Sequence, residues 1–254
     1  MKTHHMKQCY MLGRGLRMKI KAIHAIYFEL SNICNYSYFH KKCPLHYVVT
    51  KQTLPLNVIK KAISELKSIE YDNSIWFNNY NEPLSDPRLF YIINYVKTHL
   101  NKSKIHINTN GFYLDQNLAD ELYECGVDEI IISLYSKEES ERLRAIKFSM
   151  DVHMSDYATN SLDDRNNIYQ RELLYCNLPC YSLETEIIIR YTGDVGLCCL
   201  DWDNRYNYGN LNHMSLEEIL GSSCVQEITS QLKKGKRQLE ICKRCNWQRG
   251  NICY

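Results

Sequence analysis

Residues 104–136 read KIHINTNGFYLDQNLADELYECGVDEIIISLYS, and this stretch decides the fold class. The segment KIHINTNG is typical of a strand that ends at a glycine, and DQNLADELYECG is typical of a helix closed by Gly126. The last segment, VDEIIISLYS, is a nearly continuous apolar run, the kind of strand that is buried on both faces of a parallel sheet. A strand, a helix and a second buried strand in this order indicate parallel strands joined by a helical crossover.

The same alternation extends toward the N-terminus. Strands are predicted over residues 22–30 and 74–80, and helices over 54–69 and 86–100. For the second of these helices, Asp86 is the expected cap and Pro87 the first helical residue. Strict alternation of strands and helices predicts an α/β fold with a parallel sheet, built either as an open sheet or as a barrel.

The pattern changes in the second half of the chain. The periodicity blurs from about residue 138 to residue 170, where SLDDRNN indicates a polar loop. Beyond it, ETEIIIRYTGDVGLCCLDW predicts a hairpin that turns at residues 192–194, and Ser215 and Glu218 have the spacing of a capping box. We therefore expect an N-terminal segment (1–21), a first domain (22–170) and a C-terminal extension (171–254).

Composition narrows the class of protein. The net charge of +2 offers no global attraction to nucleic acid, and no apolar run is long enough to cross a bilayer. The basic N-terminus has no apolar segment ending in a cleavage site, so the sequence predicts a cytoplasmic protein with no membrane partner. In that reducing compartment, the twelve cysteines are expected to be metal ligands, catalytic groups or buried thiols.

Polar segments follow each predicted strand of the first domain. They are SNICNYSYFHKKCP, NNYNEPLSDP, NTNG and SLYS, in chain order. In a parallel β/α fold the carboxyl ends of the strands meet at one edge, where active sites form. The convergence of four polar segments at that edge predicts an enzyme.

These segments resemble the radical S-adenosylmethionine (SAM) superfamily over residues 22–136. A cysteine loop after the first strand is followed by NYNEPL, TNG and ISLYS, in the family's order. The resemblance implies a partial (β/α)6 barrel that binds SAM. In the family a Gly-Gly-Glu-Pro tip binds the amino group of SAM, and the fourth tip meets its ribose and carboxylate. The implied SAM-binding residues here are Tyr80, Asn81, Glu82, Pro83, Asn110 and Ser133.

The family's cluster loop reads Cys-x3-Cys-x2-Cys. Its three thiolates hold a [4Fe–4S] cluster whose open iron binds SAM, and reduction of SAM yields the 5′-deoxyadenosyl radical that takes a hydrogen atom from substrate. In this chain the loop holds Cys34, His40 and Cys43 in a Cys-x5-His-x2-Cys spacing. Imidazole can replace thiolate on iron, so His40 is the candidate third ligand and His46 a second imidazole. Another ligand folding in, or loss of the cluster, are the alternatives.

Four further cysteines lie in the extension: Cys180, Cys198, Cys242 and Cys245. By spacing alone, four thiolates suit zinc and a [4Fe–4S] cluster equally well. The stretch resembles the auxiliary-cluster extension of radical SAM enzymes in its short "twitch" form, which implies a [4Fe–4S] cluster. Cys199 competes with Cys198, because adjacent side chains in a strand face opposite ways. The remaining cysteines are expected to be structural or free thiols: Cys9, Cys125, Cys176, Cys224 and Cys253.

The resemblance also bears on the reaction. Arg165 matches an arginine that lies near SAM and substrate in the family, and it is the candidate catalytic residue, although it also fits a surface arginine in a polar loop. The family includes radical dehydrogenases of aminocyclitols and enzymes that modify peptides. We therefore expect an oxidoreductase acting on a small sugar-like molecule or a peptide, with a flavodoxin- or ferredoxin-type electron donor. The alternative is a degenerate relative that binds SAM or a partner without radical chemistry.

Overall fold

The computed structural model describes residues 14–38, 43–156 and 178–245. Within these ranges the helices are α1 (Arg14–Lys21), α2 (Leu56–Ser68), α3 (Leu89–His99), α4 (Gln116–Cys125), α5 (Lys137–Arg144), α6 (Ser182–Thr185), α7 (Leu216–Gly221), α8 (Ser223–Lys233) and α9 (Glu240–Lys243), with short 3-10 turns η1 (Pro44–Tyr47) and η2 (Pro83–Ser85). The strands are β1 (Ala25–Phe28), β2 (Ser74–Trp76), β3 (Lys104–Thr109), β4 (Glu129–Leu134), β5 (Asp151–Asp156), β6 (Glu186–Ile189), β7 (Asp194–Gly196) and β8 (Asn207–Asn210). None of the helices in these ranges is long and apolar enough to cross a membrane.

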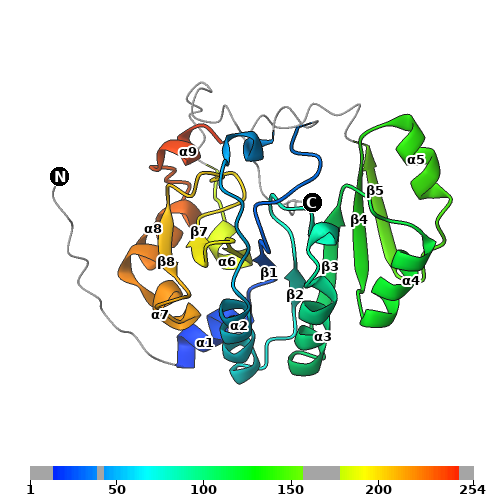
Figure 1. Cartoon of the computed structure of the whole chain (residues 1–254). Coiled ribbons are helices and arrows are strands. Elements are labelled where there is room, and N and C mark those ends of the chain that lie inside the picture. Colours follow the sequence, from blue (N-terminus) through cyan, green and yellow to red (C-terminus); the bar gives the residue numbers. More distant parts are fainter. Residues whose placement is uncertain (1–13, 39–42, 157–177, 246–254) are drawn as a thin grey trace.

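One sheet connects both halves of the described chain, in the order β5-β4-β3-β2-β1-β6-β7-β8. Strands β1 to β5 are parallel to their neighbours, and β6 lies parallel to β1 on its other side, with Phe28 opposite Ile189. Strands β7 and β8 are antiparallel. Figure 1 shows the sheet passing from green β5 and β4 through β1 to β8, with α7 and α8 near the β8 end and α4 and α5 near the β5 end.

The two faces of the sheet carry different side chains. On one face, residues such as Ile26, Ile75 and Ile130 join the large core that the helices cover. On the other face, Tyr27, Trp76, Ile131 and Ile188 form a smaller cluster. The His106 ring stacks on Trp76 of that second face, with 4.4 Å between the ring centroids, so this face carries polar as well as apolar groups.

Several local predictions are confirmed. The hairpin β6–β7 turns through Gly193 (φ 87°), Ser215 and Glu218 form a capping box, and Gly126 caps α4 in the left-handed conformation (φ 99°). The blurred stretch after residue 138 contains α5 and β5, which the sequence pattern did not reveal because β5 (DVHMSD) is mostly exposed.

The predicted start of the third helix is wrong. Helix α3 begins at Leu89, with Arg88 as its N-cap residue, and not at Pro87 with Asp86 as the cap. The Asp86 carboxylate instead accepts hydrogen bonds from the backbone and the guanidinium of Arg88. The Asp86 carboxylate therefore forms an ion pair with Arg88 instead of capping the helix. The domain boundary near residue 170 lies outside the described residues.

Candidate functional site

Glu82 follows β2 and organises the carboxyl edge of the sheet. Its side chain is almost fully buried and accepts hydrogen bonds from Thr109 Oγ1 (2.6 Å), Asn110 N (2.8 Å) and Leu84 N (3.0 Å). Burial raises the pKa of Glu82 to about 7, against the opposing effect of these hydrogen bonds. A buried carboxyl with a raised pKa favours a cationic ligand, because a nearby positive charge restores the ionised form.

Asn110 joins this tip to the cysteine loop. Its side-chain amide donates to Asn35 Oδ1 at 2.8 Å and lies 3.8 Å from Cys34 Sγ. Gly111 follows with φ of +72°, and a Cβ there would lie 2.8 Å from Leu143 Cδ1. Only glycine combines this conformation with so close a neighbour, so the TNG tip turns immediately after the residue that contacts the thiol.

The Cys34 thiol lies among negatively ionisable groups. Burial, followed by the charges of Glu82 and Cys43, raises its pKa to about 12. All three groups become anions when they ionise, so a bound cation would favour the ionised forms and displace the thiol protons. The donor set of this site fits an iron–sulfur cluster, with Cys34 and Cys43 as candidate ligands.

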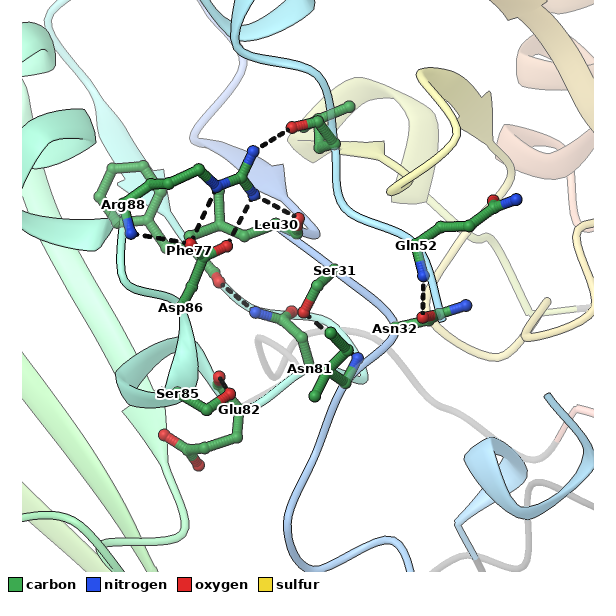
Figure 2. Close-up of polar contacts among 12 residues, drawn as sticks. Leu30, Ser31, Asn32, Gln52, Phe77, Asn81, Glu82, Ser85, Asp86 and Arg88 are labelled. Atoms are coloured by element: carbon green, nitrogen blue, oxygen red, sulfur yellow. Dashed lines mark hydrogen bonds and ion pairs between the residues drawn. The ribbon is translucent and has the colours of Figure 1, made fainter. Parts of the chain in front are cut away.

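The loop that carries these cysteines is closed at its neck (Figure 2). Asn32 donates through its side chain to Thr50 O (2.8 Å) and accepts from Gln52 N (2.8 Å). Leu54 N donates to Leu30 O at 2.8 Å, so the two ends of the loop run side by side. The neck holds both cysteines on one closed loop.

Arg88 ties this neck to the β2 tip. Its guanidinium donates to Leu54 O (2.7 Å) and Leu30 O (3.1 Å), one from each side of the neck. The same group pairs with the buried carboxylate of Asp86 at 2.7 Å (Figure 2). One planar fork thus connects three segments, which a lysine ammonium could not do with the same geometry.

The remaining predicted SAM-binding residues are all described, whereas one predicted cluster ligand and the predicted catalytic residue are not. Asn81 is buried and its side chain donates to Phe77 O at 3.0 Å, while Pro83 begins η2. Ser133 is buried on β4, with its Oγ 3.5 Å from Asn108 Oδ1. The exposed His46 ring meets Tyr38 edge-on at 6.1 Å. His40 and Arg165 lie outside the described residues.

Four thiols come together in the extension. Cys242 lies near Cys180 and Cys245, and burial followed by these neighbours raises its pKa to about 12. Burial also raises the pKa of Cys198, with Cys199, Cys242 and Cys245 acting in the same direction. The residues come from positions far apart in the chain and share one partly apolar environment, as a thiolate-bound cluster requires.

Cys198 and Cys199 face different surroundings. Both border the main core, but Cys199 also packs against the Tyr27 and Trp76 cluster on the second face of the sheet. Among the described residues, no group of three or more His, Cys, Asp or Glu side chains has the arrangement of a site for a metal ion. Cys198 stays the predicted ligand, and Cys199 differs from it in packing against the smaller cluster as well.

Sequence reasoning missed two charged residues at this edge. Glu29 directly follows β1 and Arg190 directly follows β6, and they form a buried ion pair with Arg190 Nε 2.8 Å from Glu29 Oε2. Tyr80, predicted as a SAM-binding residue, directs its hydroxyl to Cys199 O in the extension. A charged residue immediately after a fully buried strand was the available signal.

Comparisons with known proteins agree with this arrangement. Residues 180–246 match the SPASM family, described as an iron–sulfur cluster-binding domain. The chain is 22% identical over 237 residues to an S-adenosyl-L-methionine-dependent 2-deoxy-scyllo-inosamine dehydrogenase from Niallia circulans, covering 89% of this chain and 94% of that one.

Solved structures share the fold. BtrN in complex with AdoMet and 2-DOIA has a TM-score of 0.72 at 21% identity, covering 88% of this chain and 93% of that one. Native anSMEcpe with bound AdoMet has a TM-score of 0.54 at 13% identity, covering 88% and 86%. The resemblance to radical SAM enzymes with an auxiliary-cluster extension is thereby confirmed, and so is the α/β partial-barrel fold. The sixth parallel strand, β6, lies beside β1 and belongs to the extension.

Proposed function

We propose that this protein is a radical SAM oxidoreductase that cleaves SAM reductively and removes a hydrogen atom from a small cyclitol-like substrate. The observation that carries the proposal is the junction of three strand tips at one thiol. Asn110 lies 3.8 Å from Cys34 Sγ, and its backbone donates to Glu82 at 2.8 Å. Glu82 N in turn donates to Ile33 O, next to Cys34, at 2.9 Å.

The chain's own residues hold and orient the reactants. Among the described residues, Cys34 and Cys43 are the proposed ligands of the first cluster. Glu82 is proposed to receive the amino group of SAM at the β2 tip. When bound, the cluster supplies the electron that cleaves SAM to the 5′-deoxyadenosyl radical. Asn110 orients the cysteine loop through Asn35, and Ser133 lies at the fourth tip, where the ribose and carboxylate are expected. Arg165 is proposed to contact the substrate.

A second cluster is proposed on Cys180, Cys198, Cys242 and Cys245. Their clustering, and the match of residues 180–246 to an iron–sulfur cluster-binding family, favour [4Fe–4S] over zinc. We assign this cluster to the short twitch form of the extension, residues 171–254. When bound, such a cluster would supply an acceptor outside the first cluster for the second electron of a dehydrogenation.

The substrate class rests on the comparisons. A cyclitol-type molecule is favoured because the relative named a 2-deoxy-scyllo-inosamine dehydrogenase aligns over most of both chains. A peptide is the second candidate, because anSMEcpe also shares the fold and has been solved with a bound peptide. We further propose a flavodoxin- or ferredoxin-type donor and a cytoplasmic location, where exposed clusters and thiols stay reduced.

Anaerobic reconstitution tests the proposal. Two clusters correspond to about eight irons per chain, and dithionite with SAM should yield 5′-deoxyadenosine. About four irons with no 5′-deoxyadenosine would support the alternative, a relative that binds SAM or a partner without radical chemistry. That alternative draws on the Cys-x5-His-x2-Cys loop, because an imidazole ligand raises the cluster potential and makes reduction of SAM harder.

His40 is tested by two substitutions. His40→Ala should remove the first cluster, leaving about four irons, whereas His40→Cys should retain it and lower its potential. His46→Ala is the matched control, a second imidazole on the same loop, and should leave the iron content unchanged. An unchanged iron content and unchanged SAM cleavage in His40→Ala would exclude His40 as a ligand.

A further inference from the structure

Three side chains connect the SAM-binding edge to the cysteine segment of the extension. Glu29 follows β1, Tyr80 follows β2 and Arg190 follows β6. Strands β1 and β6 are parallel neighbours, with Phe28 opposite Ile189. All three residues therefore lie at the carboxyl edge of the sheet, and we call them the Arg190 clasp.

Arg190 forms hydrogen bonds with the chain just beyond the candidate ligand Cys198. Its Nη2 donates to Trp202 O at 2.7 Å and its Nη1 to Asp201 O at 3.5 Å. Asp201 N closes a turn on Cys198 O at 3.1 Å. The guanidinium therefore holds both carbonyls at the end of the turn that begins at the ligand.

Tyr80 forms a hydrogen bond with the same segment from the SAM-binding side. Its hydroxyl donates to Cys199 O, and its ring lies beneath the Arg190 guanidinium, with 5.5 Å from the guanidinium carbon to the ring centroid. Tyr80 immediately precedes Asn81 and Glu82 in the SAM-binding tip. One residue thus belongs by its backbone to the SAM site and by its side chain to the auxiliary site.

Glu29 links Arg190 to Tyr80. Its carboxylate pairs with Arg190 Nε at 2.8 Å and accepts from the backbone N of Tyr80 and from Asn79 Nδ2, both at 3.2 Å. The side chains of Glu29 and Arg190 are 0% and 6% exposed, so the pair is desolvated. Apolar residues of similar volume usually stabilise a fold as well as a buried ion pair does, which leaves orientation as the distinctive contribution of this one.

We propose that the Arg190 clasp is a positioning unit that couples occupancy of the SAM site to the reduction potential of the auxiliary cluster. Hydrogen bonds and backbone dipoles around the ligand sulfurs set such potentials. A ligand that contacts the Tyr80–Glu82 tip shifts the Tyr80 hydroxyl, and with it the Cys199 carbonyl, which lies one residue beyond Cys198. By linkage, the oxidation state of the auxiliary cluster changes the affinity of the SAM site by the same factor.

The inference rests on the proposed function, and its test is a ligand-dependent shift in potential. The reduction potential of the auxiliary cluster is measured on the reconstituted protein by redox titration, with the cluster followed by electron paramagnetic resonance. S-adenosylhomocysteine is the probe, since it keeps the amino and carboxylate groups and lacks the cleavable sulfonium. Coupling of about fivefold, at the lower end of the usual range, corresponds to a shift of about 40 mV at 59 mV per tenfold.

Tyr80→Phe removes one hydroxyl and keeps the ion pair, so it should reduce this shift to less than half. Tyr208→Phe is the matched control. Like Tyr80, Tyr208 is a buried tyrosine. It belongs to the extension and lies near Cys198 and Cys242. Its hydroxyl has no hydrogen-bond partner among the residues that the structure describes, so its variant should keep the full shift even where its absolute potential differs.

Arg190→Lys tests the planar fork, because it keeps the charge but cannot hold Glu29 and two carbonyls together. It should also lose most of the shift, and if this variant fails to fold, Tyr80→Phe alone decides. A wild-type protein that binds S-adenosylhomocysteine without any shift, or a Tyr80→Phe variant with the wild-type shift, would overturn the coupling alone. A protein that binds neither the analogue nor iron would contradict the proposed function and the coupling together.

Discussion

The two candidate cluster sites are built in opposite ways. The first site hangs Cys34 and Cys43 on one loop, nine positions apart in the chain. The second site takes its thiols from a segment before α6, from the chain after β7, from α9, and from Cys245, two residues beyond α9. Closing a site within one loop orders little of the chain, whereas closing one between distant segments orders the whole extension.

Because of this difference, the fold around each site is expected to depend on metal to a different degree. At the first site the strand tips and the loop neck are already held by Glu82, Asn32 and Arg88, so the surrounding fold does not depend on metal. At the second site, short elements such as α6 and α9 pack around the thiols themselves. A cluster there would cross-link ligands from separate elements, so metal binding is expected to contribute directly to folding.

The largest expected effect follows from removing a ligand of the second site. Cys242→Ser should lose about four irons and lower the Tm by roughly 10 °C or more, because the extension loses its cross-link. Cys34→Ser should lose a similar amount of iron with a Tm change of only a few degrees. Iron analysis and thermal unfolding followed by circular dichroism measure both quantities.

Cys224→Ser is the matched control for these variants. Cys224 is a half-buried thiol of the same extension that is outside the proposed ligand set. It should retain the full iron content and the wild-type Tm. Equal losses of Tm in Cys34→Ser and Cys242→Ser would remove the proposed distinction between the two sites.

A smaller effect is expected from the neck of the first loop. Arg88→Ala leaves the buried Asp86 carboxylate without its ion-pair partner and frees the carbonyls of Leu30 and Leu54. The free energy of unfolding should fall by about 2–4 kcal/mol, below the usual cost of breaking a fully buried pair because Arg88 is partly exposed. Urea denaturation checks this value.

Arg144→Ala provides the comparison for Arg88. Arg144 is exposed and its guanidinium donates to Ser140 Oγ at 3.1 Å. Its replacement should change the free energy of unfolding by less than about 0.5 kcal/mol. Cluster content should fall in Arg88→Ala and stay unchanged in Arg144→Ala, and an intact first cluster in both would show that the neck does not depend on Arg88.

The smallest expected effect is a pH dependence carried by Glu82. Its pKa is about 7 in the folded state and 4.5 ordinarily, so the folded state holds more protons between these values. Stability of the cluster-free protein should therefore fall as pH rises from about 4.5 to 7, by about 1–3 kcal/mol in total, and then level off.

Glu82→Gln should remove that part of the pH dependence. Other carboxyls with raised pKa values, such as Glu65 and Asp201, are present in both proteins and cancel in the difference. Urea denaturation at several pH values between 4.5 and 8 measures it. Parallel stability profiles for the two proteins would show that Glu82 does not titrate in this range.

Much of the fold was predictable because its signals are local. The apolar run that became β4, the glycine that closes α4 and the capping box at Ser215 each act within a few residues. Strand β5 escaped detection since its exposed edge position leaves no apolar pattern. The start of α3 was misplaced because Asp86 pairs with Arg88, whose guanidinium is held by the distant carbonyls of Leu30 and Leu54.

The candidate site was predictable only in part. Motif order placed Cys34, Glu82 and Asn110 at one edge of the sheet, and spacing marked the four thiols of the extension. The link between these sites was not predictable, because Glu29 and Arg190 are 161 positions apart and neither belongs to a motif. Tyr80 was assigned to SAM by its motif, although its hydroxyl reaches Cys199 O.

By itself, the sequence determined the α/β class, the edge at which the site forms and the cysteines available to it. Those features depend on periodicity and residue chemistry, which act over short stretches of chain. The tertiary structure decided which charges pair in the absence of water, as Glu29 does with Arg190. Such pairs form only when the fold buries both partners together, because an unpaired charge in the interior is too costly to keep.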